Sequence, residues 1–149
     1  MDKPFYQLTV LNEAFRFDFM SVGRNQIPKT ITFYKTDDPR LFTLTLATVR
    51  PDGSLDTKTV SNNGDMEKIL VTVYKAIDIF LSNRSSVIVG FSGNTDARTR
   101  LYQIAIAKHF FYLSEHFNIW GLTNNDIESF CINRKYLGFF ISLKNVNID

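Results

Sequence analysis

The sequence contains few of the residues that crosslink small proteins. Its 149 residues include a single cysteine, Cys131, and two histidines, His109 and His116. A lone cysteine forms no internal disulfide and is typical of a compartment in which thiols stay reduced. The two histidines fall ~10 Å apart on a predicted helix and form no H-E-x-x-H motif, so we expect no metal site. Folding then depends on an apolar core, which a chain of this length can build without staples.

Strong net charge and long apolar runs are also absent. Seventeen Lys and Arg against fifteen Asp and Glu leave a net charge of +2, and the basic residues are scattered along the chain. Nucleic acid is therefore not an expected partner. Apolar runs such as Phe139-Phe140-Ile141 fall far below the ~20 residues of a membrane-spanning helix. The first residues lack the pattern of a signal peptide, and we expect a cytoplasmic protein that does not bind membranes.

The composition is that of an ordinary globular domain, with 44% apolar, 14% aromatic and 21% charged residues. No repeat, low-complexity tract or linker interrupts residues 1–149, which predicts a single domain. From Phe5 to Val60 apolar residues alternate with polar ones, and this pattern indicates about four or five strands. Pro51-Asp52-Gly53-Ser54 is a turn that joins 41–50 and 55–60 as an antiparallel hairpin.

The second half alternates helix and strand. Apolar spacing predicts a helix from about Asp65 to Ser82, with Asn63 or Asp65 as its cap. The apolar run Ser86–Phe91 is typical of a buried central strand, and a second helix follows from about Thr95 to Phe117. Two further strands are expected at 118–122 and 136–143. The order predicts an α+β fold, a largely antiparallel sheet of about six or seven strands with two principal helices.

The second helix carries apolar residues on two faces. One stripe repeats at helical spacing and should pack on the sheet; it consists of Tyr102, Ile106, Phe110, Leu113 and Phe117. The other face gives the candidate interface residues Leu101, Ile104, Lys108 and Phe111. Because large apolar patches are uncommon on monomers, we expect this face to be covered by the first helix, by a second copy of the chain or by a partner.

The start of the second helix is the candidate anion-binding site. A helix N-terminus presents unpaired backbone N–H groups and partial positive charge, so basic residues there need an anion or a carboxylate nearby. The candidate residues are Ser92, Gly93, Asn94, Thr95, Arg98, Arg100, Tyr102 and His109. In the structural alternative, Asn94 or Thr95 only caps the helix and the arginines pair with Asp65, Glu67 or Asp96.

Motifs for catalysis are incomplete. The chain has neither G-x-x-x-x-G-K-[ST] nor G-x-G-x-x-G, and Ser92 lies in F-S-G-N instead of G-x-S-x-G. His109 is either a general acid or base near neutral pH, or a boundary histidine satisfied by hydrogen bonds. Cys131, in F-C-I, is expected to be an inert thiol buried in a strand or at its edge. We therefore expect no cofactor, and catalysis is the second interpretation.

Five stretches stand out as motifs: F-D-F-M-S-V-G at 17–23, S-N-N-G-D-M-E-K-I-L-V-T-V at 61–73, F-S-G-N-T-D-A-R-T-R-L-Y at 91–102, W-G-L at 120–122 and K-Y-L-G-F-F-I at 135–141. Together they resemble a bacterial family of small cytosolic domains of unknown function. The most specific motif is G-[SN]-T-x-A-R-T-R-L-Y. The resemblance implies the fold and cellular class, and it implies no activity.

Two functional hypotheses follow. In the first, the chain is a cytosolic, non-catalytic binding or regulatory domain that recognises a protein partner or itself, because it lacks a complete catalytic motif and carries a surplus apolar helix face. In the second, it is an enzyme or ligand-binding protein that takes a phosphate- or carboxylate-bearing small molecule at the start of the second helix.

The second hypothesis predicts that phosphate or sulfate raises the melting temperature, because an anion bound to the folded state stabilises it. The response should saturate at low millimolar anion and weaken in Arg98→Ala and Arg100→Ala. Chloride at matched ionic strength controls for screening. An identical response in the parent chain and both variants would leave the arginines with a structural role only.

Overall fold

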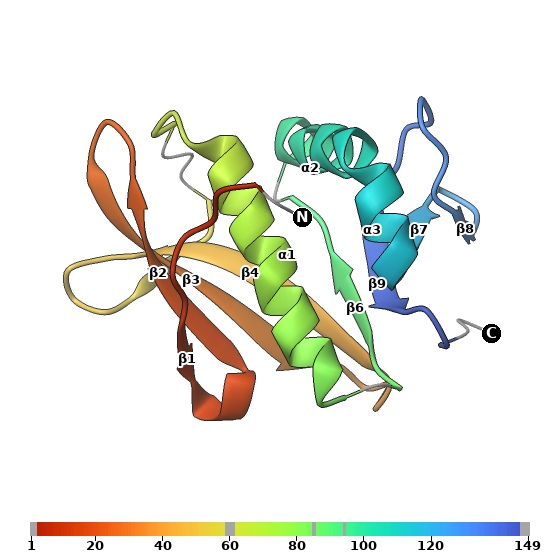
Figure 1. Ribbon diagram of the computed structural model, residues 1–149, viewed down its shortest axis with the longest axis horizontal. Helices are drawn as coiled ribbons and strands as arrows, with labels where there is room; N and C mark the ends of the chain where they lie inside the picture. Colours follow the sequence, from red (N-terminus) through yellow and green to blue (C-terminus); the bar gives the residue numbers. More distant parts are fainter. Residues whose placement is uncertain (1–2, 59–61, 85, 94, 147–149) are drawn as a thin grey trace. The chain divides into compact units, whose positions relative to one another are not determined.

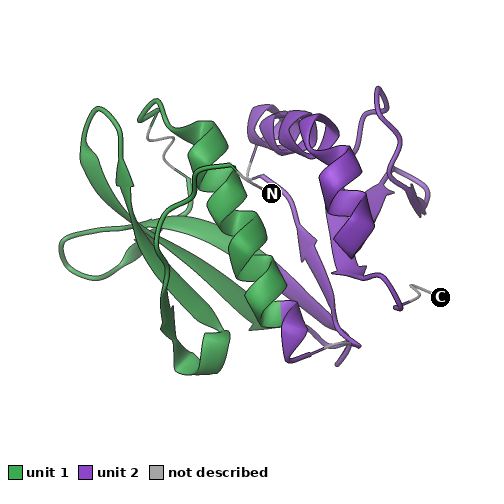
Figure 2. Ribbon diagram, viewed as in Figure 1, with its two compact units in different colours: residues 1–34, 44–80 green, residues 35–43, 81–149 purple. Residues whose placement is uncertain are grey.

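The computed structural model describes residues 3–58, 62–84, 86–93 and 95–146 and has an α+β fold (Figure 1). This confirms the predicted fold class. The chain divides into two compact units (Figure 2), one of Met1–Tyr34 and Leu44–Phe80 and the other of Lys35–Thr43 and Leu81–Asp149. They are called unit 1 and unit 2 below.

The first half of the chain forms strands, as the alternation predicts. These are β1 (Thr9–Leu11), β2 (Arg16–Val22), β3 (Gln26–Lys35), β4 (Leu41–Val49) and β5 (Leu55–Asp56), with a short 3-10 turn, η1 (Asn12–Ala14), between the first two. β2 is antiparallel to both β1 and β3, and β4 forms the predicted hairpin with β5. The helix that follows, α1 (Met66–Ser82), lies within one residue of its predicted bounds.

The core of unit 1 is built from phenylalanines on one face of β2 and β3. Phe17 lies opposite Ile31 in the register, and both are fully buried. Phe33 stacks on Phe80 of α1, with 4.0 Å between the ring centroids. α1 buries residues on most of its circumference, as expected for a helix with so few polar positions. The alternating apolar residues of the strands and the regularly spaced apolar residues of α1 therefore pack into one aromatic core.

Hydrogen bonds tie the start of α1 to the rest of unit 1. The Asp65 carboxylate directly precedes the helix and accepts hydrogen bonds from the Tyr6 hydroxyl and the Ser21 hydroxyl, each at 2.5 Å. The Asn63 amide donates to the Ser21 hydroxyl at 2.9 Å, and its oxygen accepts from the Asn25 backbone N–H at 2.8 Å. The two residues predicted as helix caps thus hold distant segments together.

Unit 2 contains the remaining strands and helices. They are β6 (Ile88–Phe91), α2 (Asp96–Lys108), α3 (Phe110–His116), β7 (Phe117–Leu122), β8 (Ile127–Ser129) and β9 (Gly138–Leu143). β6 pairs in parallel with the start of β4 and antiparallel with β9, which also pairs with β7. The order of the sheet is β1-β2-β3-β4-β6-β9-β7-β8, with β5 beside β4.

The described residues form a sheet of nine strands, so the expected count of six or seven is wrong. The three shortest strands, β1, β5 and β8, span only two or three residues each. A strand of this length shows too little alternation to be counted from sequence. The prediction of a largely antiparallel sheet is confirmed.

The predicted helix at 95–117 is two helices that meet at His109. The backbone of His109 has φ −107° and ψ 18°, outside the helical region, and α3 begins at the next residue. The sequence there, His109 to Tyr112, consists of aromatic side chains that favour helix only weakly. His116 consequently lies on a different helix from Arg98 and Tyr102, and the prediction that one helix carries both histidines is wrong.

Cys131 is exposed, so the prediction of a buried thiol is wrong. The strand β8 ends at Ser129, and only Phe130 points inward from the F-C-I sequence. Beyond it, residues 131–136 form a loop, called the 131–136 loop below. An aromatic residue before a cysteine is therefore not enough to indicate a strand.

Tyr136 holds the far end of this loop. Its hydroxyl donates to the Glu128 carboxylate at 2.8 Å and accepts from the Cys131 backbone N–H at 2.9 Å. The ring lies where a side chain on Gly121 would be, so β7 needs glycine at that position. Burial, together with the hydrogen bond to Glu128, raises the pKa of Tyr136 to about 12.

We expect Asp65→Ala to lower the free energy of unfolding by about 1–3 kcal/mol, because Tyr6 and Ser21 lose a shared acceptor at a largely buried site. Urea denaturation measures the change. Asp78→Ala removes an exposed carboxylate from the same helix and is the matched control. Equal urea midpoints for Asp65→Ala and Asp78→Ala would show that the hydrogen bonds to Asp65 do not stabilise the fold.

We also expect the protein to lose stability as pH rises from ~10 toward 12, because the folded state keeps the Tyr136 proton that the unfolded chain releases near its ordinary pKa. Tyr136→Phe should make the loss of stability with rising pH smaller. At neutral pH the same change should lower the free energy of unfolding by roughly 1 kcal/mol. Tyr34→Phe, at an exposed tyrosine, is the control. Denaturation midpoints at pH 8 and pH 11 give the comparison, and parallel slopes for all three chains would contradict it.

Candidate functional site

Two threonine hydroxyls bind backbone groups around the start of α2. Thr95 is the N-cap of α2, and its hydroxyl accepts from the Arg98 backbone N–H at 3.1 Å. The Thr99 hydroxyl accepts from the Gly93 backbone N–H at 3.0 Å and donates to the Thr95 carbonyl at 3.1 Å. Asn94, the other predicted cap, lies outside the described residues. The predicted capping role therefore falls to Thr95.

Gly93 allows another group to approach its backbone closely. In the structure that group is α2, and not a ligand. A Cβ atom at this position would lie 2.5 Å from the Thr99 backbone nitrogen and 2.6 Å from the Arg98 Cβ. Both distances are shorter than real contacts of this kind, so the loop packs on α2 only because residue 93 has no side chain. The glycine that sequence analysis assigned to a ligand thus has a packing role.

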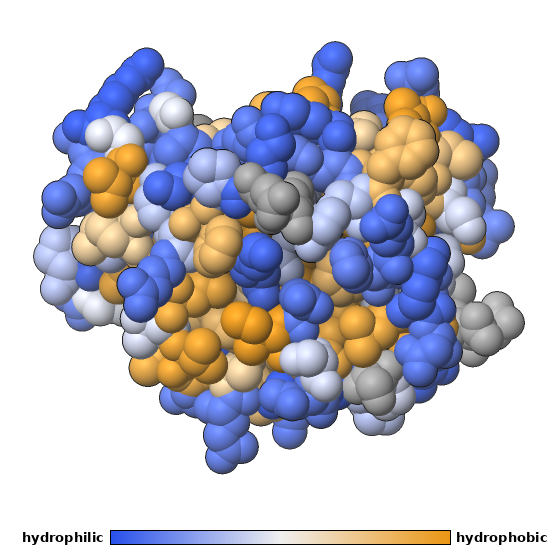
Figure 3. Space-filling view, in the orientation of Figure 1, coloured by the Kyte–Doolittle hydropathy of each residue, from blue (hydrophilic) through white to orange (hydrophobic). Residues whose placement is uncertain are grey.

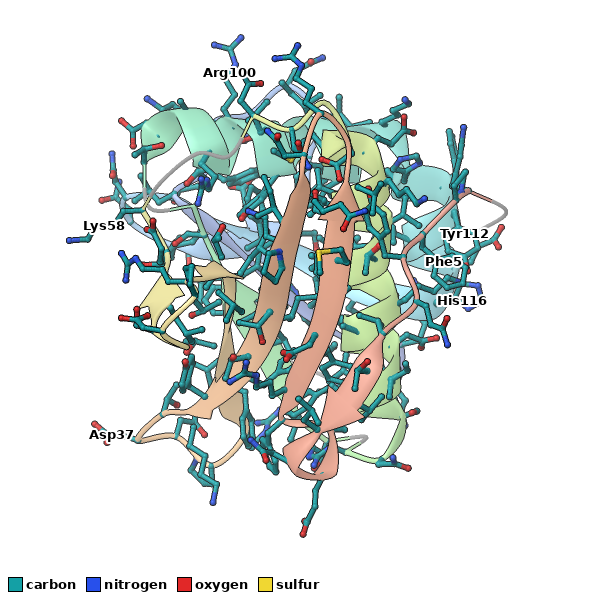
Figure 4. The ribbon with its side chains drawn as sticks, turned by 90° about the vertical axis from the view of Figure 1, so that its left-hand side faces the viewer. Phe5, Asp37, Lys58, Arg100, Tyr112 and His116 are labelled. Atoms are coloured by element: carbon teal, nitrogen blue, oxygen red, sulfur yellow. The ribbon has the colours of Figure 1, made fainter. Side chains whose placement is uncertain are left out.

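The two arginines of the candidate anion site point to different sides of α2. Residues two positions apart on a helix are ~200° apart around its axis. Arg100 is exposed and projects outward (Figure 4). Arg98 is half-buried near Tyr102, whose pKa is raised mainly by burial, while the arginine charge opposes that rise. The two positive charges therefore do not converge on one point.

The remaining candidate residues are spread along α2. Ser92 is exposed beside Gly93. Tyr102 is buried with its ring against Phe91, 6.0 Å between centroids, and His109 is buried at the other end of the helix. The eleven positions from Arg98 to His109 correspond to ~16 Å along a helix. The structure gathers Gly93, Thr95 and Arg98, whereas Arg100 and His109 lie apart, and anion binding stays a prediction.

The candidate interface residues, by contrast, are all exposed on α2 and α3 of unit 2. Leu101, Ile104 and Phe111 are 41%, 55% and 90% exposed, and Lys108 between them is exposed as well. Coverage by the first helix stays a prediction. We call these four residues the α2–α3 surface. Coverage by a second copy or a partner stays a prediction.

A groove runs beside this surface, between α2 and the 131–136 loop. It has a volume of about 960 Å³, and Leu101, Ile104, Ala107 and Ile132 supply its apolar lining. Arg100, Arg134 and Lys135 are the basic residues along it, and Asp96 is the one carboxylate among its lining residues. Apolar side chains also gather at the upper right of the space-filling view, where Figure 1 places α3 and the 131–136 loop (Figure 3).

Gln103 fixes the loop that forms the second wall of the groove. Its amide N–H donates to the Arg134 carbonyl, and its oxygen accepts from the Tyr136 backbone N–H at 3.3 Å. Arg134 in turn pairs with Glu128 at 3.2 Å. No sequence pattern predicted this wall. The available signal was Ile132 and Leu137, two large apolar residues in a short polar segment, both of which are exposed.

Two kinds of site have no support in the described part of the chain. Among residues 3–58, 62–84, 86–93 and 95–146, no group of His, Cys, Asp and Glu side chains is arranged to hold a metal ion. Within those same ranges, no helix has the length and apolar character needed to cross a bilayer.

Comparison with known proteins gives a family and no activity. No curated protein and no solved structure matches the chain significantly. A family model described as a family of unknown function (DUF6934) matches residues 2–144, nearly the full length of the sequence. This agrees with the resemblance to small domains of unknown function. The chain therefore belongs to the DUF6934 family.

Proposed function

We propose that the chain is a non-catalytic binding domain that acts by contact with another protein through the α2–α3 surface. The observation that carries this proposal is the 90% exposure of Phe111 on α3, together with the exposure of Leu101 and Ile104 on α2. Large apolar side chains that gather at an exposed surface are typical of contact sites. Aromatic side chains also contribute a large share of binding energy in protein interfaces.

The energetics favour coverage of this surface. Burying one large apolar side chain is worth roughly 1.5–3 kcal/mol, and three such residues project from helices whose backbones are already ordered. Binding here consequently requires little ordering of the protein beyond its side chains. The groove beside the surface adds apolar area on the 131–136 loop.

A small anionic ligand at the start of α2 has weaker support. Gly93 and Thr99 use their polar groups on each other, and Arg98 and Arg100 diverge. The lone, exposed Cys131 favours a reducing compartment, and we place the protein in the bacterial cytoplasm, as its sequence motifs imply.

Photo-crosslinking from position 111 tests the proposal. A benzoylphenylalanine in place of Phe111 should form a discrete adduct with a protein when the cells that contain it are irradiated. The same probe in place of exposed Asp37 is the control (Figure 4). Adding Ile104→Glu should remove the adduct from position 111, because a buried charge without a partner opposes binding.

The mass of the adduct identifies the partner. Twice the mass of the chain indicates a second copy, which sedimentation velocity at micromolar concentration would show independently; a different mass indicates another protein. Either result supports the proposal. If positions 111 and 37 give the same adducts, or if Ile104→Glu leaves the adduct unchanged, the α2–α3 surface is not a contact surface.

A further inference from the structure

We propose that the groove between α2 and the 131–136 loop binds an acidic, amphipathic segment of a partner protein. This inference rests on the proposed function and names the chemistry of the partner. It starts from three properties of the groove: an apolar lining, an excess of basic side chains and a fixed second wall.

The apolar lining matches one side of a short helix. Leu101, Ile104 and Ala107 lie on successive turns of α2, and Ile132 faces the same groove from the loop. From Leu101 to Ala107 the helix advances ~9 Å, about the length over which a peptide helix presents anchors at i, i+3 or i+4, and i+7. A segment with two or three apolar anchors therefore fits the lining.

The charges along the groove determine which polar residues a bound segment should carry. Within the part of the chain that the structure describes, Arg100 and Lys135 make no ion pair, whereas Arg134 is paired with Glu128. Asp96 is the one carboxylate along the groove. Carboxylates on a bound segment can reach Arg100 on one wall and Lys135 on the other, so a partner with Asp or Glu beside its apolar anchors is favoured.

The same charges disfavour a second copy as the occupant. In a two-fold contact the same surface lies on both sides, so the basic excess of Arg100, Lys108 and Lys135 would meet the same excess on the second copy. Juxtaposed like charges weaken such an interface. An acidic partner has no such penalty, and this difference separates the two occupants that an apolar surface alone would allow.

The second wall makes the groove a preformed site. Gln103 binds the loop backbone at Arg134 and Tyr136, and the Tyr136 hydroxyl joins the loop to Glu128 and Cys131. A wall held at both ends needs no reordering when a segment binds, which lowers the entropic cost of association.

Selection from a random displayed-peptide library tests the inference. Peptides of about 16 residues, ~24 Å as a helix, are selected on the full chain and counter-selected on Ile104→Glu, whose fold is checked by circular dichroism. The enriched peptides should combine Leu, Ile or Phe at helical spacing with an excess of Asp and Glu. Binding should also fall with increasing salt.

Charge reversal then tests the basic residues directly. The double variant Arg100→Glu, Lys135→Glu should weaken an enriched acidic peptide by about two- to fivefold for each residue changed and should shift a new selection toward Lys and Arg. Lys35→Glu with Lys58→Glu makes the same change in net charge at exposed positions outside the groove and is the matched control.

The outcomes separate this inference from the proposed function. Peptides that depend on Ile104 but show no acidic excess overturn the inference and leave the proposed function standing. So does a homodimer that Ile104→Glu dissociates. Failure to enrich any peptide that depends on Ile104 also overturns the inference, and photo-crosslinking from position 111 then decides the proposed function separately.

Discussion

One half-buried carboxylate fixes the geometry of unit 1. Asp65 accepts two short hydrogen bonds, from Tyr6 near the N-terminus and from Ser21 on β2, at the point where α1 begins. Hydrogen bonds to an ionised acceptor are stronger than neutral ones, and at a site with little water they are costly to lose. These bonds hold β2 and the start of α1 together, and Phe80, farther along the same helix, stacks on Phe33 of β3.

Unit 2 uses a neutral side chain in a comparable way. Gln103 projects from α2 and satisfies backbone groups of a loop more than thirty positions later in the chain. Because an amide both donates and accepts, one side chain can hold a loop that lacks a strand partner. The groove exists because of this contact, and the proposed binding chemistry depends on its two walls.

Much of the fold could be predicted from local patterns. Alternation located β2, β3 and β4, apolar spacing located α1, and helical periodicity identified Leu101, Ile104 and Phe111, all of which are exposed. The break at His109 could not be predicted, because local propensity there is only slightly unfavourable to helix and tertiary packing decides. The groove could not be predicted either, because nothing in the sequence near Gln103 indicates that this side chain contacts residues 134 and 136.

The single cysteine offers one defined position for attaching a spectroscopic probe. Cys131 is exposed and adjoins Ile132, a lining residue of the groove. An environment-sensitive dye attached to this thiol would report on the 131–136 loop in the otherwise unaltered chain, since there is no second thiol to label. Whatever enters the groove would change the polarity around the dye, and its emission would follow occupancy in real time.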